Sequence, residues 1–197
     1  GVDIDKIKEP NSEGITKGLE NLDKHIHNMR LYGQSVVVAF NRYTTDTDEE
    51  IDIVRKHCEE LGVGFAVNNA FNEGGAGAKE LARLVVNTIE QAPSKKLHLI
   101  YDNDETVEAK IEHVAHDIYG AATVSYGNEA KKKLKMIKEL GFERFPVCIA
   151  KTQYSFSTDP KLYGVAKDFD VNVSDIVINA GAEMLVAIAG KIMRMPG

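Results

Sequence analysis

Two aromatic residues, Tyr43 and Phe71, occupy similar places in the sequence and could together bind a flat ring. Each follows a short apolar run, residues 35–40 for Tyr43 and residues 62–67 for Phe71. Neighbouring parallel strands end at the same edge of a sheet, and ligands bind in the crevice outside their carboxyl ends. The spacing therefore predicts a slot with one aromatic ring from each loop.

Polar residues and glycines surround the two aromatics. Asn41 and Thr44 flank Tyr43, whereas Gly74, Gly75 and Gly77 follow Phe71. Amide and hydroxyl groups could bind the edge of a stacked ring, and glycine allows the backbone to approach a ligand closely. The glycine segment matches neither phosphate-binding motif, GxxxxGK[ST] or GxGxxG, and indicates a tight turn before a helix. In the alternative interpretation, the aromatics only cover the end of the sheet.

The elements that hold these loops alternate between strand and helix. Residues 35–40 are apolar and β-branched, typical of a strand buried on both faces. Thr47 and Glu50 form a capping-box pattern that predicts the start of a helix. A second strand over residues 62–67 and a helix over residues 79–91, with Val85 and Ile89 facing inward, complete the unit.

The same alternation extends to about residue 142, which predicts a parallel strand–helix–strand sheet with helices on both faces, a Rossmann-like three-layer α/β domain. Its remaining expected elements are a helix from Asn11 or Ser12 to about Tyr32, a strand at 97–100, a helix capped by Asp104, a strand at 121–126 and a helix at 128–140.

The sequence pattern of residues 143–197 predicts a smaller β-rich C-terminal lobe. Short extended runs are expected at 146–150, 169–173, 175–179 and 184–188. Lys151, Thr152 and Gln153 directly follow the first of these runs. Such a polar loop either faces a phosphate or carboxylate or is a hydrogen-bonded structural loop, and the pattern leaves both interpretations open.

Composition excludes several functional classes. A chain of 197 residues, 43% hydrophobic, can bury a substantial core, and its net charge of −6 argues against nucleic acid or an acidic membrane as the main partner. No apolar run is long enough to cross a bilayer. Cys58 and Cys148 lie in apolar segments and are expected to be buried thiols in a reducing compartment, the cytoplasm.

We expect no metal site and no catalytic residue in this sequence. His113 and His116 could share one helix face, but no third ligand accompanies them. There is no Ser-His-Asp or Cys-His pattern.

Five blocks of sequence carry a resemblance to a known family. They are VVVAFNRYTTDTDEEI, AFNEGGAGAKELA, YGNEAKKKLKMIKELGF, PVCIAKTQYSFSTDPKLYG and INAGAEMLVAIAGKIMRMPG. On these blocks the chain closely resembles formate–tetrahydrofolate ligase over almost its whole length. The resemblance covers roughly the C-terminal third of that enzyme, and the family's ATP-binding glycine-rich loop belongs to the N-terminal part, which this sequence lacks.

The resemblance implies an ATP-dependent reaction that joins formate to tetrahydrofolate through formyl phosphate, with Mg²⁺ as the phosphate-binding ion and activation by monovalent cations. It implies tetrahydrofolate, formate and ATP as ligands, and the N-terminal part of the enzyme as a partner, with a homo-oligomer also expected. The pterin would stack between Tyr43 and Phe71. Asn41 and the turn from Gly74 to Gly77 would face adenine and pterin.

Two positions depart from the family pattern. Phe71 stands where the family commonly has Trp, and Thr44 stands where a Pro commonly follows the first aromatic. Both changes are expected to loosen the slot.

Two functional hypotheses follow. In the first, the chain is a fragment of the ligase that supplies the pterin-stacking wall and is inactive alone. In the alternative, it is a non-catalytic folate- or nucleotide-binding module or an assembly scaffold. A purely structural role of the loops is the third interpretation.

Overall fold

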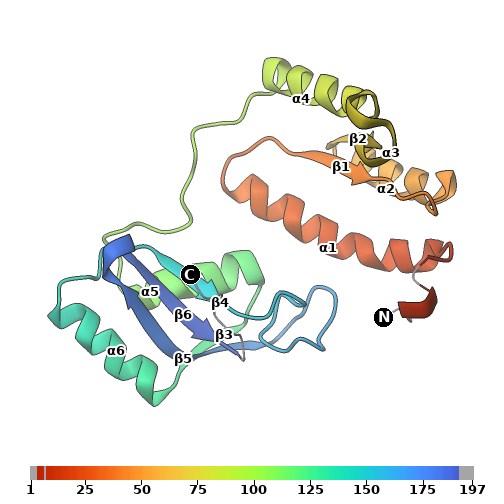
Figure 1. The fold of residues 1–197 in the computed structure, drawn as a ribbon. Helices are drawn as coiled ribbons and strands as arrows, with labels where there is room; N and C mark the ends of the chain where they lie inside the picture. The colour runs from red at the N-terminus through yellow and green to blue at the C-terminus, as the bar shows by residue number, and fades with distance from the viewer. Residues whose placement is uncertain (1–3, 7, 191–197) are drawn as a thin grey trace. The chain divides into compact units, whose positions relative to one another are not determined.

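The computed structural model describes residues 4–6 and 8–190, and its chain divides into two compact units, Gly1–His98 and Leu99–Gly197 (Figure 1). Both combine helices with strands, so the fold is α/β. The expected division at residue 142 falls inside the second unit, because β3 before it and β5 after it pair in one sheet. Residues 191–197 of the expected lobe lie outside the described residues.

The first unit contains a two-stranded parallel sheet. Its elements in chain order are η1 (Ile4–Lys6), α1 (Ser12–Leu31), β1 (Val37–Asn41), α2 (Asp48–Glu60), β2 (Gly64–Asn68), α3 (Ala70–Glu73), η2 (Gly74–Ala78) and α4 (Lys79–Gln91).

Helices lie on both faces of this sheet. On one face, Val38, Phe40 and Phe65 pack with a small core from α1, α2 and the segment before β2, formed by Ile26, Val54, Cys58 and Val63. On the other face, a Cβ built on Gly64 would lie 3.1 Å from Cδ1 of Leu84 on α4. The first unit therefore has three layers, as the alternating pattern predicts (Figure 1).

Capping side chains join the starts of α1 and α2. Asn11 Oδ1 accepts a hydrogen bond from Gly14 N at 2.8 Å, and Thr47 and Glu50 form the predicted capping box. The Glu50 carboxylate also accepts the Asn11 backbone N–H at 2.7 Å. Backbone donors at Thr47 and Asn11 stabilise the charged form and hold the pKa of Glu50 below its usual range.

Three expectations for the first unit are wrong. β1 is not buried on both faces, since Ala39 is exposed; α4 covers β2 more fully than β1. Because α4 lies mainly over β2, Val85 and Ile89 on α4 are exposed instead of facing inward. Residues 97–100 form no strand. The backbone N–H of His98 donates a hydrogen bond to Tyr32 O, just after α1, at 3.1 Å, and not to a neighbouring strand.

The second unit contains a four-stranded mixed sheet in the order β3-β5-β6-β4. Only β5 and β6 pair antiparallel; the β3–β5 and β4–β6 pairs are parallel. Its elements are α5 (Val107–His113), the π-helix η3 (Val114–Tyr119), β3 (Thr123–Tyr126), α6 (Asn128–Glu139), β4 (Val147–Ala150), β5 (Asp170–Asn179), η4 (Ala180–Ala182) and β6 (Met184–Ala189).

The main core of the chain lies in this second unit. Alternate residues of β5 and β6 are buried and pack with Ile111 of α5 and Ile137 of α6. Asp104 does not cap the helix as expected; Thr106 does, accepting a bond from Ala109 N at 3.2 Å. Cys148 is exposed, contrary to expectation, because burial alternates along the edge strand β4 and Cys148 lies on its open face.

None of the helices in residues 4–6 and 8–190 has the length and apolar character needed to cross a membrane.

Candidate functional site

The two expected aromatics contribute to one open groove in the first unit. This groove has a volume of about 280 Å³ and lies at the carboxyl ends of β1 and β2. Tyr43 is 73% exposed and Phe71 is 97% exposed. Large aromatic side chains left in solvent at a concave site indicate a binding surface, not a core. The residues that line the groove are Asn41, Arg42, Tyr43, Thr44, Asn68, Phe71 and Asn72.

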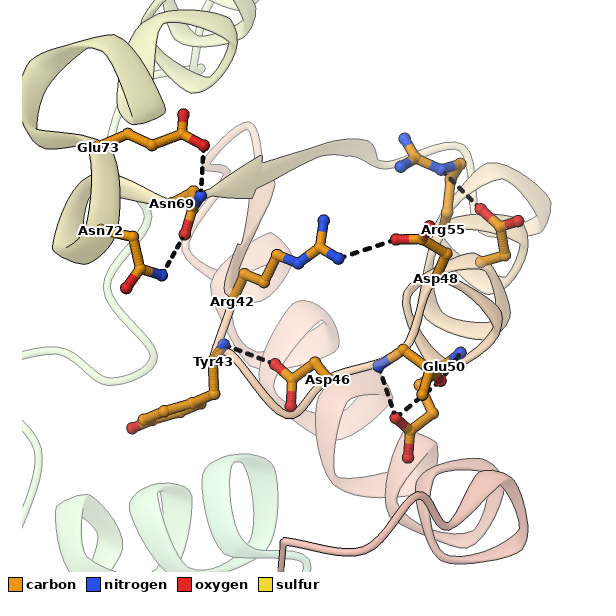
Figure 2. Close-up of polar contacts among 11 residues, drawn as sticks. Arg42, Tyr43, Asp46, Asp48, Glu50, Arg55, Asn69, Asn72 and Glu73 are labelled. Carbon is orange, nitrogen blue, oxygen red and sulfur yellow. Dashed lines mark hydrogen bonds and ion pairs between the residues drawn. The ribbon is translucent and has the colours of Figure 1, made fainter.

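A tight turn fixes the backbone of Tyr43. Its N–H donates to Asp46 Oδ2 at 2.7 Å, and its carbonyl accepts the N–H of Asp46 at 3.1 Å. On the preceding residue, Arg42 Nη2 donates to Asp48 Oδ1 at 3.0 Å, at the first residue of α2. Figure 2 shows the Tyr43 ring extending away from these contacts. The turn therefore holds the residue while its ring remains available to a ligand.

Amide groups connect the two strand ends beneath the groove. Asn41 and Asn68 are partners in the parallel register, and Asn68 Nδ2 donates to Asn41 Oδ1 at 2.8 Å. Arg42 N donates to Asn68 O at 3.0 Å and continues the ladder by one bond. The side-chain oxygen of Asn68 accepts the N–H of Ala70 at 3.2 Å. This network sets the spacing between the loop of Tyr43 and the helix that carries Phe71.

Phe71 lies on the short helix α3, not in a loop as expected. Polar side chains stabilise this helix from within: Asn69 Nδ2 donates to Glu73 Oε1 at 2.8 Å, and Asn72 Nδ2 donates to Asn69 Oδ1 at 2.7 Å (Figure 2). These bonds link Asn69, Asn72 and Glu73 to one another, while the Phe71 ring remains 97% exposed.

The three glycines have different surroundings, and none of them lines the groove. Gly74 has a positive φ of 60°, and a Cβ on Gly74 or Gly75 would meet no atom within 4 Å. A Cβ on Gly77 would lie 2.4 Å from Asn69 O, and Gly77 O accepts the Asn69 N–H at 3.0 Å. The segment is a 3₁₀ turn, and Gly77 allows it to close against the end of β2.

The polar loop after β4 belongs to the second unit. Lys151 and Thr152 are buried there, whereas Gln153 is exposed. Lys151 Nζ donates to Thr152 O at 3.1 Å and to Ser155 O, and it lies 4.5 Å from the centroid of the Tyr119 ring. Burial lowers the pKa of Lys151 to about 8. These contacts are those of a cation that organises its own loop.

Three groove residues were not selected from the sequence: Arg42, Asn68 and Asn72. Asn68 could have been found, because it stands at the same offset from its strand as Asn41 does. Asn72 could not, since its position depends on α3 being helical. Within residues 4–6 and 8–190, no three His, Cys, Asp or Glu side chains gather as a metal site would require.

The fold and this groove define an α/β protein with an open groove outside the carboxyl ends of a parallel strand pair, the position where α/β proteins commonly bind ligands. Comparison with known proteins gives the family: the model for formate–tetrahydrofolate ligase matches residues 1–197. The chain belongs to the formate–tetrahydrofolate ligase family.

Curated relatives in this family are considerably longer than this chain. The chain is 62% identical over 197 residues to formate–tetrahydrofolate ligase of Phocaeicola vulgatus and 58% identical to that of Bacteroides fragilis, and in both cases it spans 36% of the relative. The ligase of Petrotoga mobilis is 44% identical over 197 residues, with 35% of its length covered. The chain therefore spans about a third of the length of these relatives.

Proposed function

We propose that this chain supplies the pterin-binding wall of an ATP-dependent ligase that joins formate to tetrahydrofolate. The observation that carries the proposal is the shared groove of Tyr43 and Phe71, both exposed, at the carboxyl ends of paired strands. Stacking on an aromatic ring contributes about 1 kcal/mol beyond the burial of area. A flat bicyclic pterin presents two faces and can use both rings.

The polar side chains of the groove suit the edge of such a ring. Arg42 provides donors, whereas Asn41, Thr44 and Asn72 provide both donors and acceptors. A pterin carries donors and acceptors on its pyrimidine edge, so these side chains would orient the ring once it is stacked. The role proposed for the chain is to bind and orient the folate, holding its amine toward the formyl group.

We further propose that the phosphoryl chemistry belongs to the remaining polypeptide of the enzyme. There, ATP would transfer its terminal phosphoryl group to formate and give formyl phosphate and ADP. The folate amine would then attack the formyl carbon, form the C–N bond and release phosphate. Charge-stabilising lysine and arginine side chains and a Mg²⁺ ion are the usual requirements of the first step, and the groove residues supply one such cation, Arg42.

The proposal places this reaction in a reducing compartment such as the cytoplasm. Cys58 and Cys148 are both free thiols, and Cys148 is exposed. Exposed free thiols persist where the environment is reducing.

Ring removal tests the groove directly. Tyr43→Ala and Phe71→Ala should each weaken binding of tetrahydrofolate to the purified chain about fivefold to thirtyfold, equivalent to roughly 1–2 kcal/mol. Phe71→Trp should strengthen binding, because the indole ring is larger and adds an N–H donor. Isothermal titration calorimetry measures all three.

Tyr163→Ala is the matched control, since Tyr163 is 68% exposed and lies in the other unit. It should bind tetrahydrofolate like the unmodified chain. Equal affinities for the unmodified chain, Tyr43→Ala and Phe71→Ala would refute the stacking wall.

The non-catalytic module is the other candidate, because all the lining residues of this groove belong to one compact unit, Gly1–His98. The two candidates differ in one result. Adding the remaining part of a relative's ligase should give formate-dependent ATP turnover that neither polypeptide shows alone. Folate binding without such turnover would favour the module.

A further inference from the structure

The edge strand β4 of the second unit has a backbone that could pair with a further strand. Among the described residues β4 pairs only with β6, so no strand lies along its other edge. Its four residues, Val147–Ala150, are apolar and carry no charge. An uncharged apolar edge strand is a template for pairing with another chain unless other groups cover its backbone. The groups that cover this edge are side chains.

The Tyr101 hydroxyl occupies the edge of β4 at Val147. It accepts the Val147 N–H at 3.0 Å and donates to Val147 O at 3.4 Å. The neighbouring carbonyl, Pro146 O, accepts the N–H of Leu185 on β6 at 2.9 Å, so the backbone groups of Val147 point away from β6. These outward N–H and C=O groups are the ones that an added strand needs. Tyr101 therefore takes the place of a strand partner.

Lys110 holds the same two segments together at a second point. Its side chain is fully buried, and its Nζ donates to three backbone carbonyls: Asn103 O at 2.7 Å, Glu143 O at 2.6 Å and Phe145 O at 3.3 Å. Asn103 lies two residues after Tyr101, and Phe145 lies two residues before Val147. The segments therefore run antiparallel, and side chains join them instead of a backbone ladder.

A second copy of β4 would fit this edge once it is uncovered. In an antiparallel pair related by a twofold axis, Val147 would exchange both backbone bonds with Ile149 of the second copy. Cys148 would then lie opposite Cys148 of the second copy, at a position without hydrogen bonds between the two residues. No charge would oppose a like charge, because β4 has none.

We propose that residues 101–103, which we call the strap, block β4 from pairing with β4 of a second copy of this chain. Tyr101 is the residue that closes the edge, and Lys110 fixes the strap in place. The strap lies close to the start of the second unit, which begins at Leu99. All of these residues belong to that unit, whereas the groove of Tyr43 lies in the other, so the blocking role is independent of folate binding.

Removing one oxygen atom tests the strap. Tyr101→Phe keeps the ring but loses both bonds to Val147, and it should shift the chain at least about tenfold toward a dimer, the effect of one good backbone hydrogen bond. Tyr126→Phe is the matched control, because the Tyr126 hydroxyl also donates to a backbone carbonyl, Glu108 O at 3.4 Å, but lies on the opposite edge strand β3. It should associate like the unmodified chain. Sedimentation velocity measures all three proteins, and unchanged association of Tyr101→Phe would overturn the proposal.

Cys148 reports which strands pair in the dimer. Oxidised glutathione should link Cys148 to Cys148 of the second copy in Tyr101→Phe and not in the unmodified chain, because opposed residues at such a position lie about 4.5 Å apart at Cα. Cys58 is fully buried and does not compete. Cys148→Lys, added to Tyr101→Phe, should abolish the dimer, since two like charges would face each other. A dimer that forms no link, or that survives Cys148→Lys, would place the contact elsewhere and overturn the proposal.

A measurement on the unmodified chain covers the case in which Tyr101→Phe does not fold. Backbone groups alternate along a strand with a period of two, so the N–H of Ile149 points outward like that of Val147. Bonding to Tyr101 should make the Val147 N–H exchange with solvent more slowly than the Ile149 N–H, as measured by nuclear magnetic resonance. Equal rates, or slower exchange at Ile149, would show that Tyr101 does not cover the edge.

Discussion

At the scale of single residues, Lys151 shows how a sequence motif can have more than one use. Its position after a buried strand suits an anion site, yet its ammonium group bonds to Thr152 O and Ser155 O and faces the Tyr119 ring. No carboxylate among the described residues forms an ion pair with it. A buried cation that is compensated only by neutral groups costs stability in its charged form.

This cost predicts a pH dependence of stability. The pKa of Lys151 is about 8 in the folded chain and 10.5 in a model peptide. Between these values the unfolded chain binds more protons than the folded one, so the free energy of unfolding rises with pH. Lys151→Met lacks this titration, so the free energy of unfolding of the unmodified chain should rise relative to that of Lys151→Met between pH 8 and 10. Urea unfolding at pH 7, 8, 9 and 10 measures it.

The measured quantity is the difference between the free energies of unfolding of the two proteins at each pH. Contributions from other groups that titrate in the same range are common to both proteins and cancel in this difference. Lys161→Met, in the same loop region but exposed, is the control and should follow the unmodified chain. Parallel pH profiles for the unmodified chain and Lys151→Met would contradict the assignment.

At the scale of elements, the segment from Asn69 to Ala78 decides where Phe71 lies. Asn69 directly precedes α3 as its N-cap residue; its side-chain oxygen accepts a hydrogen bond from Asn72 Nδ2, and its N–H donates to Gly77 O. The glycines therefore act on the groove through the backbone that carries Phe71. Direct ligand contact by these glycines stays a prediction.

Replacing one glycine tests this role. Gly77→Ala should destabilise the chain by about 1–3 kcal/mol, because the new methyl group overlaps Asn69 O, and should weaken tetrahydrofolate binding by moving α3. Urea unfolding and calorimetry measure the two effects.

Gly75→Ala is the matched control for that substitution. Gly75 lies in the same turn, has open space around its Cβ position and no positive φ. Its replacement should be neutral or slightly stabilising in unfolding. Equal destabilisation by the two substitutions would show that the contact with Asn69 does not limit this segment.

At the scale of the whole molecule, the two units differ in how much core they bury. Among the described residues, the second unit buries a cluster of 14 hydrophobic residues, whereas the cluster in the first unit has four. In the first unit, Ala39 on β1 and Val85 and Ile89 on α4 also remain exposed. Burial of apolar area is the main source of stability, so the first unit should be the weaker one.

We therefore expect two unfolding transitions in urea, with Gly1–His98 unfolding first. Amide hydrogen exchange should be faster in α2 and β2 than in β5 and β6. Saturating tetrahydrofolate should raise only the first midpoint, because ligand stabilises the unit that binds it. A single transition seen by all probes would contradict the independence of the units.

The sequence alone determined much of the element pattern and the identity of the groove aromatics. Capping at Asn11 and at Thr47 with Glu50 is local chemistry, so the helix starts at Ser12 and Asp48 followed from residue types. Tyr43 and Phe71 were predictable because strand ends meet at one sheet edge.

Tertiary structure decided which apolar residues are buried and how the strands are grouped. Val85, Ile89 and Cys148 have the same apolar neighbours in the sequence as buried residues do, yet they are exposed. Periodicity identifies a face that can be buried, but burial also needs a second surface to cover it. For Ala39 on β1 and for Val85 and Ile89 on α4, no such surface exists within the described residues. The pairing of β3 with β5 across residue 142 depends on contacts between segments far apart in the chain.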